Sequence, residues 1–148
     1  MIAKNKMELR IPSVLGYEKL AMDFVTSAAR LLKLPEQRIE DLRTAVSEAC
    51  INAIEHGHRF DASVRVGIML TLEDMTLEID VTDEAEESIG QPPVPDIDAK
   101  IAGRDSPRGW GVFLIKNLVD DVHFESNPGK GNSVKMIFHV DKQRSPMR

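Results

Sequence analysis

Cysteine is nearly absent from this chain, since Cys50 is the only one among 148 residues. One cysteine cannot close an internal disulfide, and Cys50 falls within a helical pattern, so we expect a reducing, cytoplasmic setting. No run reaches the roughly 18 apolar residues of a membrane-spanning helix, so we expect no membrane association. The amino terminus lacks the apolar segment of a signal peptide, which agrees with a cytoplasmic location.

The chain also lacks an excess of positive charge. It has 19 Lys and Arg against 24 Asp and Glu, a net charge of -5. A nucleic-acid binder needs a basic face for phosphate contacts, so we expect no direct binding of nucleic acid. A Walker-type Gly-Lys-Ser/Thr loop, a Gly-x-Ser-x-Gly elbow and zinc-ligand spacing of Cys and His are all missing. These absences argue against P-loop, serine-hydrolase and zinc chemistry.

The spacing of apolar residues predicts one domain, residues 1–148, with its core at about 7–140. The length suits a single hydrophobic core, and the 42% hydrophobic content is ordinary for a globular protein. Alternating apolar residues predict strands at 7–11, 64–72, 75–82, 119–124 and 134–140. Helical spacing, with Pro and Gly at the ends, predicts helices at 18–34, 35–56 and 108–118.

This order of elements predicts a two-layer α/β (α+β) sandwich. The hairpin 64–82 has one apolar and one polar face, so its sheet is covered by helices on one side only. The sheet is expected to be mixed and mostly antiparallel. Residues 84–107 lose all periodicity and contain several Pro and Gly residues. A loop of that length in a compact domain indicates a functional lid or a disordered segment.

The second predicted helix carries the most informative polar residues. At about 100° per residue, Glu48, Asn52 and Glu55 fall within roughly 60° of one another, beside an apolar face. If Glu48 or Glu55 is considered by itself, its position on a solvated edge of an amphipathic helix is a sufficient explanation. Asn52 is harder to explain in this way, because Asn is a poor helix former in the middle of a helix.

A second candidate motif opens the third predicted helix at Gly109-Trp110-Gly111, followed by Val112. Glycine permits close approach of the backbone, and the start of a helix offers free N–H groups to an anion, so the motif could cradle a phosphate. A plain turn into a helix is the alternative. Arg104 and Arg108 are the nearest basic groups, and a guanidinium suits phosphate oxygens, although solvated loop arginines are equally frequent.

The pattern Glu48-x-x-x-Asn52-Ala53-x-x-His56 resembles the N box of the GHKL ATPases, the superfamily of gyrase, Hsp90, histidine kinases and MutL. Its surroundings look most like the anti-sigma-factor serine/threonine kinases, and the resemblance covers about residues 7–140. It implies a Bergerat-type ATP-binding fold with ATP and Mg²⁺ as cofactors. It also implies that Asn52 is the metal ligand, that His56 belongs to the nucleotide site and that Glu48 is the catalytic base.

The resemblance continues through the later motifs. Residues 108–115 resemble the second glycine box, which implies that the segment from Arg108 to Val112, with Arg104, lines the nucleotide site. Asp83 stands where the family has an Asp that accepts a hydrogen bond from the adenine amino group. The family has Gly at the second and fourth positions after that Asp, whereas this chain has Ala85 and Glu87. Asn132-Ser133 replaces the family's small-Thr pair before the last strand.

These features predict a regulatory protein kinase that binds ATP·Mg²⁺ and phosphorylates a small antagonist (anti-anti-sigma) protein. Such a kinase could also hold a sigma factor, and the resemblance leaves a homodimer open. A non-catalytic, sequestering module of the same fold is the alternative, because Ala85 and Glu87 could weaken nucleotide binding. A histidine-kinase ATPase fragment is a third reading, against which the lack of a preceding dimerisation helix with a phosphoacceptor His argues.

Overall fold

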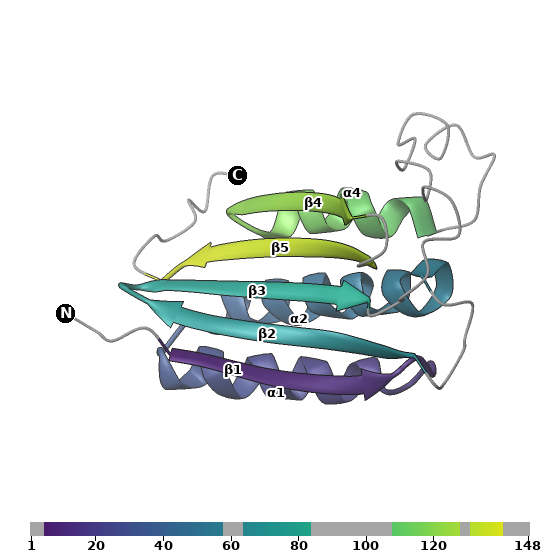
Figure 1. Ribbon diagram of the computed structural model, residues 1–148. Helices are drawn as coiled ribbons and strands as arrows, with labels where there is room; N and C mark the ends of the chain where they lie inside the picture. Colours follow the sequence, from purple (N-terminus) through teal and green to yellow (C-terminus); the bar gives the residue numbers. More distant parts are fainter. Residues whose placement is uncertain (1–4, 58–63, 84–107, 128–130, 141–148) are drawn as a thin grey trace.

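The computed structural model describes residues 5–57, 64–83, 108–127 and 131–140 (Figure 1). The predicted lid at 84–107, which includes Ala85 and Arg104, lies outside the described residues. The structure describes only the backbone of His56, Gly57, residues 108–110 and residues 126–127.

The described strands form one five-stranded sheet in the order β1-β2-β3-β5-β4. The strands are β1 (Asn5–Pro12), β2 (Arg65–Glu73), β3 (Thr76–Asp83), β4 (Asp121–Asn127) and β5 (Gly131–His139). Every neighbouring pair among them is antiparallel, so the mostly antiparallel sheet is confirmed. The parallel pairing that a mixed sheet would contain does not occur between the described strands.

The hairpin between β2 and β3 turns at Asp74 and Met75, one residue later than the sequence predicted. Both residues have positive φ, 47° and 62°. A two-residue hairpin turn whose backbone follows the right-handed twist of the strands requires φ > 0 at both central positions. Glu73 therefore extends β2, where it pairs with Thr76.

Three α-helices of the described segments form the second layer: α1 (Glu18–Leu31), α2 (Glu36–Asn52) and α4 (Arg108–Leu118). They lie on one face of the sheet, and α2 packs against both α1 and α4 (Figure 1). The alternate strand residues that face them are buried: Ile11, Val66, Ile68, Leu70, Leu77, Ile79, Val81, Met136 and Phe138. No helix in the described segments is long and apolar enough to traverse a bilayer.

The predicted α-helix to His56 changes its hydrogen-bonding pattern after Asn52. Residues Ala53–Gly57 form a π-helix, η1, which contacts β3 and β5. A π-helix has i→i+5 hydrogen bonds and therefore a wider turn, and such segments are frequent at functional sites. The 100° spacing that aligned Glu55 with Glu48 and Asn52 consequently does not hold beyond Asn52, and this part of the prediction was wrong.

Candidate functional site

The candidate site lies at one end of the molecule, where four elements finish or begin. The carboxyl ends of α2 and β3 meet the amino ends of α4 and β5 there (Figure 1). The η1 segment continues α2 and contacts β3 and β5. Most of the polar residues singled out in the sequence are on these elements.

Glu48, Asn52 and Gly111 are brought together where α4 packs on α2. A Cβ atom added to Gly111 would lie 2.5 Å from Glu48 Oε2 and 3.6 Å from Asn52 Nδ2. Contacts of 2.5 Å are not tolerated, so any larger residue would displace the Glu48 carboxylate. Glycine at this position therefore allows the α4 backbone to lie directly against two polar side chains of α2.

The Asn52 side chain has an unsatisfied oxygen. Asn52 Oδ1 is buried and has no hydrogen-bond partner among the described residues. Buried polar atoms are nearly always paired, so an oxygen without a partner among the described residues is a candidate ligand for a bound group. Carboxylate and amide oxygens are suitable ligands for Mg²⁺, and the donor chemistry of Asn52 fits that ion.

The start of α4 offers a second binding element beside these side chains. Arg108, Gly109 and Trp110 form its first turn, which contains no acidic residue. The first N–H groups of a helix have no partner within the helix and attract anions. Val112 is 7% exposed and Ile115 is fully buried, so packing fixes the position of the helix against the core.

Asp83 occupies the carboxyl end of β3 and is 3% exposed. The Asn132 backbone N–H donates to Asp83 Oδ1 at 3.0 Å, and Asn132 Nδ2 donates to Oδ2 at 3.4 Å. Gly131 has φ +89°, and a Cβ on it would collide with the Asp83 carbonyl and carboxylate. Gly131 and Asn132 were not predicted as site residues from the sequence. The Gly-Asn pair at the start of the last strand was the signal that could have indicated them.

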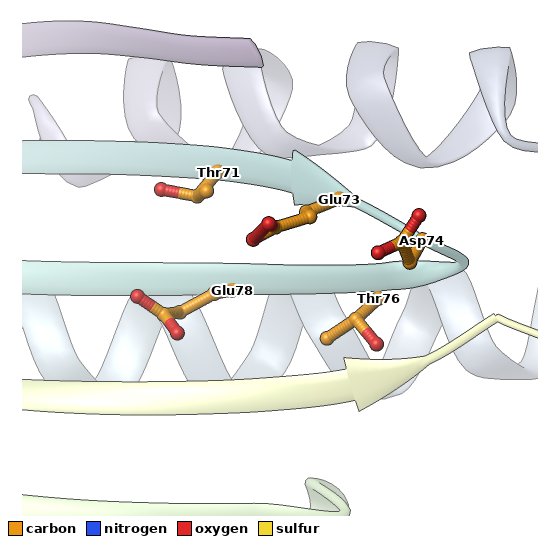
Figure 2. A pocket seen from close by; sticks show the side chains of 5 residues that line it. All are labelled: Thr71, Glu73, Asp74, Thr76 and Glu78. Atoms are coloured by element: carbon orange, nitrogen blue, oxygen red, sulfur yellow. The ribbon is translucent and has the colours of Figure 1, made fainter. Parts of the chain in front are cut away.

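A separate hollow of about 250 Å³ lies at the opposite end of the sheet (Figure 2). It is on the face that the helices leave uncovered and is lined by Thr71, Glu73, Asp74, Thr76 and Glu78. Three carboxylates disfavour a polyanionic ligand there. Within the described part of the chain, no group of His, Cys, Asp and Glu side chains is arranged to hold a metal ion.

Known proteins of similar sequence include anti-sigma F factors and a serine-protein kinase. The anti-sigma F factor of Oceanobacillus iheyensis is 32% identical over 144 residues, covering 96% of this chain and 97% of that protein. The anti-sigma F factor of Bacillus subtilis is 28% identical over 150 residues, with the same coverage. The serine-protein kinase RsbW of Bacillus subtilis is 28% identical over 142 residues, covering 93% of this chain and 88% of that kinase.

A similar fold occurs in a solved structure of the RsbU and RsbW domains of a Mycobacterium tuberculosis protein. The TM-score is 0.66 at 15% sequence identity, and 92% of this chain is matched. This chain spans 32% of that longer chain, so the likeness concerns the fold. Residues 11–138 match the family described as the histidine kinase-like ATPase domain. The α+β architecture, the sequence relatives and this match agree, and the chain belongs to the histidine kinase-like ATPase domain family.

Proposed function

We propose that this chain is a serine/threonine protein kinase of the anti-sigma-factor type. It binds ATP with Mg²⁺ and phosphorylates a small antagonist protein, and it holds a sigma factor until the antagonist releases it. The observation that supports this most strongly is the convergence of Glu48, Asn52 and Gly111, with Asn52 Oδ1 buried and unsatisfied. Relatives named as anti-sigma F factors and as a serine-protein kinase supply the class of partner.

In this proposal the nucleotide phosphates lie at the amino terminus of α4. The N–H groups of its first turn bind phosphate oxygens, and Gly111 leaves room between α4 and α2. Asn52 Oδ1 is the side-chain ligand for Mg²⁺. The ion, when bound, neutralises charge on the phosphates.

Glu48 is the proposed general base. Its carboxylate accepts the proton of the incoming serine or threonine hydroxyl, whose oxygen forms a bond to the γ-phosphorus. The bond between that phosphorus and the bridging oxygen of the β-phosphate breaks, and ADP leaves. Phosphoryl transfer depends mainly on positioning, so the close contact between Gly111 and Glu48 is important because it fixes where the base lies.

Isothermal titration of the intact chain with ATP and Mg²⁺ tests the nucleotide site. We expect wild type to bind, and Asn52→Ala to lose the Mg²⁺-dependent part of the affinity. Gly111→Ala should weaken binding because its Cβ needs the space that Glu48 occupies. Asn117→Ala is the matched control, since it removes an exposed helix amide that bonds the Phe113 carbonyl at 2.9 Å. Equal affinity in Asn52→Ala and wild type would remove Asn52 as a metal ligand.

Glu48→Gln tests the catalytic step separately. The amide has nearly the same shape as the carboxylate but cannot act as a base, so ATP binding should persist. Transfer of the γ-phosphoryl group to an antagonist that wild type phosphorylates should fall by about 100-fold or more. An unchanged rate of transfer would exclude Glu48 from the mechanism.

The second candidate function is sequestration without catalysis. Ala85 and Glu87 stand where the resemblance expects glycine, which favours weakened nucleotide binding. Under this alternative, wild type binds its protein partner but shows no heat of binding with ATP and Mg²⁺. Replacing both residues by glycine should then restore measurable ATP affinity.

A further inference from the structure

The amino-terminal part of α2 carries a buried cation, Arg38, at the end of the helix away from the candidate site. Arg38 is 3% exposed, and its Nη2 atom donates to Asp120 Oδ2 at 2.6 Å. Its Nε and Nη1 atoms are buried and have no hydrogen-bond partner among the described residues. The centre of the guanidinium lies 5.0 Å from the Phe138 ring centroid. Among those residues, Asp120 is therefore the acceptor that fixes the direction of the Arg38 side chain.

Asp120 connects the carboxyl end of α4 to two other elements. Its Oδ2 atom accepts from Arg38 of α2 and also from the His139 backbone N–H of β5, at 2.7 Å. Its own backbone N–H donates to the Ile137 carbonyl of β5 at 3.0 Å. One ion pair and two hydrogen bonds therefore hold this end of α4 against α2 and the sheet.

α2 and α4 run in opposite directions and meet through polar residues at both ends. The contact away from the site is Arg38 with Asp120, and the contact at the site is the close approach of Gly111 to Glu48. Arg38 precedes Glu48 by ten residues, which is about 15 Å along an α-helix. Gly111 precedes Asp120 by nine residues, or about 14 Å at the same rise. The matched spacing allows one helix to be fixed against the other at both ends.

The middle of α4 is anchored in the core by Ile115, which is fully buried. A rigid helix held at its middle moves as a lever, so a shift of its carboxyl end produces an opposite shift of similar size at its amino end. The amino end of α4 carries the proposed phosphate site beside Glu48. A misplacement of about 1 Å at a reacting centre can slow a reaction by about 100-fold. The attachment at Asp120 can therefore control the geometry at the opposite end of the helix.

We propose that Arg38 is a positioning residue, which acts through Asp120 to set the tilt of α4 on α2 and so the place of the phosphate site relative to Glu48. The catalytic consequence rests on the proposed function, whereas the coupling between the two ends of α4 does not. Compared with apolar residues of similar volume, a buried ion pair adds little net stability. The contribution that apolar residues could not replace is its direction.

The first test uses Trp110, the only tryptophan of the chain, as a reporter in the first turn of α4. The double variant Arg38→Met with Asp120→Asn removes both charges and leaves an amide oxygen for the His139 N–H. Neither substitution touches the first turn of α4. We expect the variant to fold, as thermal unfolding will verify, and its Trp110 emission maximum to differ from that of wild type without nucleotide. Arg38→Met alone carries the same expectation if the double variant does not fold.

Ile11→Ala is the control for a general loss of stability. Ile11 is buried in β1, at the opposite edge of the sheet from β4, and its truncation leaves a cavity in the core. This variant should be less stable than wild type but should keep the wild-type Trp110 emission maximum while folded. A shift of the same size in Ile11→Ala would show that the emission reports stability and not the position of α4, and would overturn the proposal.

The second test measures kcat and KM for phosphoryl transfer from ATP to an antagonist that wild type phosphorylates. The double variant should lower kcat per folded molecule by about tenfold or more, because the phosphates are displaced from Glu48. Its KM for ATP should stay within about threefold of wild type, because no residue that contacts the nucleotide is changed. Ile11→Ala should change neither value.

The two tests separate this inference from the proposed function. An unchanged Trp110 emission maximum, or an unchanged kcat, in the double variant would overturn the positioning role of Arg38. Equal losses of kcat in the double variant and in Ile11→Ala would also overturn it. A shifted emission maximum in the double variant, with no transfer by wild type, would overturn the kinase proposal and leave the coupling through α4 in place.

Discussion

At the scale of the residue, Cys50 shows how burial removes chemistry that the sequence leaves open. It lies in α2, two residues from Asn52, and is fully buried. Burial raises the pKa of its thiol from the ordinary 9.0 to about 12, and the Glu18 carboxylate acts in the same direction. Thiolate is the reactive form, so Cys50 should resist thiol reagents in the folded protein.

The same pKa shift predicts a loss of stability at high pH. The unfolded chain releases the thiol proton near pH 9, whereas the folded protein retains it to about pH 12. The folded state then binds more protons, so the free energy of unfolding falls as pH rises, by up to about 1.4 kcal/mol per pH unit. Urea unfolding of wild type and Cys50→Ala from pH 7 to 10.5 measures this. The difference in the free energy of unfolding between the two proteins should be constant below pH 8. Above that pH, wild type should lose stability relative to Cys50→Ala, and parallel profiles would contradict the prediction.

At the scale of the element, β3 carries a half-buried carboxylate on the uncovered face of the sheet. Asp80 lies between Met69 of β2 and Lys135 of β5. Burial raises its pKa, the Lys135 ammonium opposes this, and Glu78 and Glu125 add to it. The surroundings therefore disfavour the charged form of Asp80, and the carboxylate at this position lowers the free energy of unfolding at neutral pH.

Asp80→Asn should therefore stabilise the protein at pH 7. The gain is expected to be below about 1 kcal/mol, because the site is partly solvated. A carboxyl group with a raised pKa in the folded state destabilises the folded protein at pH values above that pKa. At low pH the group is protonated in both the folded and the unfolded state and has no such effect. The gain should accordingly disappear as pH falls to about 3, below the unfolded value. A double-mutant cycle by urea unfolding tests the role of Lys135. Lys135→Met should lower the free energy of unfolding more in wild type than in the Asp80→Asn variant. The opposite order would show that the Lys135 ammonium does not stabilise the Asp80 carboxylate.

At the scale of the whole molecule, one buried ion pair connects the helical layer to the far half of the sheet. Arg38 Nη2 of α2 contacts Asp120 Oδ2 at 2.6 Å, and both side chains are more than nine-tenths buried. The His139 backbone N–H donates to the same oxygen at 2.7 Å, and the Arg38 guanidinium lies 5.0 Å from the Phe138 ring centroid. Asp120 thus joins α2 to β5 at the point where α4 passes into β4.

Removing Asp120 should be strongly destabilising. Asp120→Ala leaves the Arg38 charge buried without its partner and removes the acceptor of the His139 N–H. Loss of one partner from a buried pair costs about 3–5 kcal/mol. Asp121→Ala is the control, because this neighbouring residue is exposed and its contact with His123 is at the surface. It should cost less than about 1 kcal/mol. Equal urea midpoints for the two variants would show that the buried pair contributes nothing.

Periodicity and turn residues alone determined much of this protein. The alternation in residues 64–82 and the helical spacing in residues 35–56 predicted the β2–β3 hairpin, α2 and the two-layer architecture, because local burial follows from which face is apolar. The resemblance at Glu48 and Asn52 predicted the family. The π-helix after Asn52 was missed, because it has the composition of an α-helix.

Tertiary structure decided which distant residues meet. The placement of β5 between β3 and β4, the approach of Gly111 to Glu48 and the contact of Asn132 with Asp83 join segments that share no local pattern. The pairing of Arg38 with Asp120 is of the same kind. Sequence spacing shows which face of an element is apolar, but the partner of that face depends on how all the elements pack together. For this reason the elements could be predicted from the sequence, whereas the contacts that build the site required the fold.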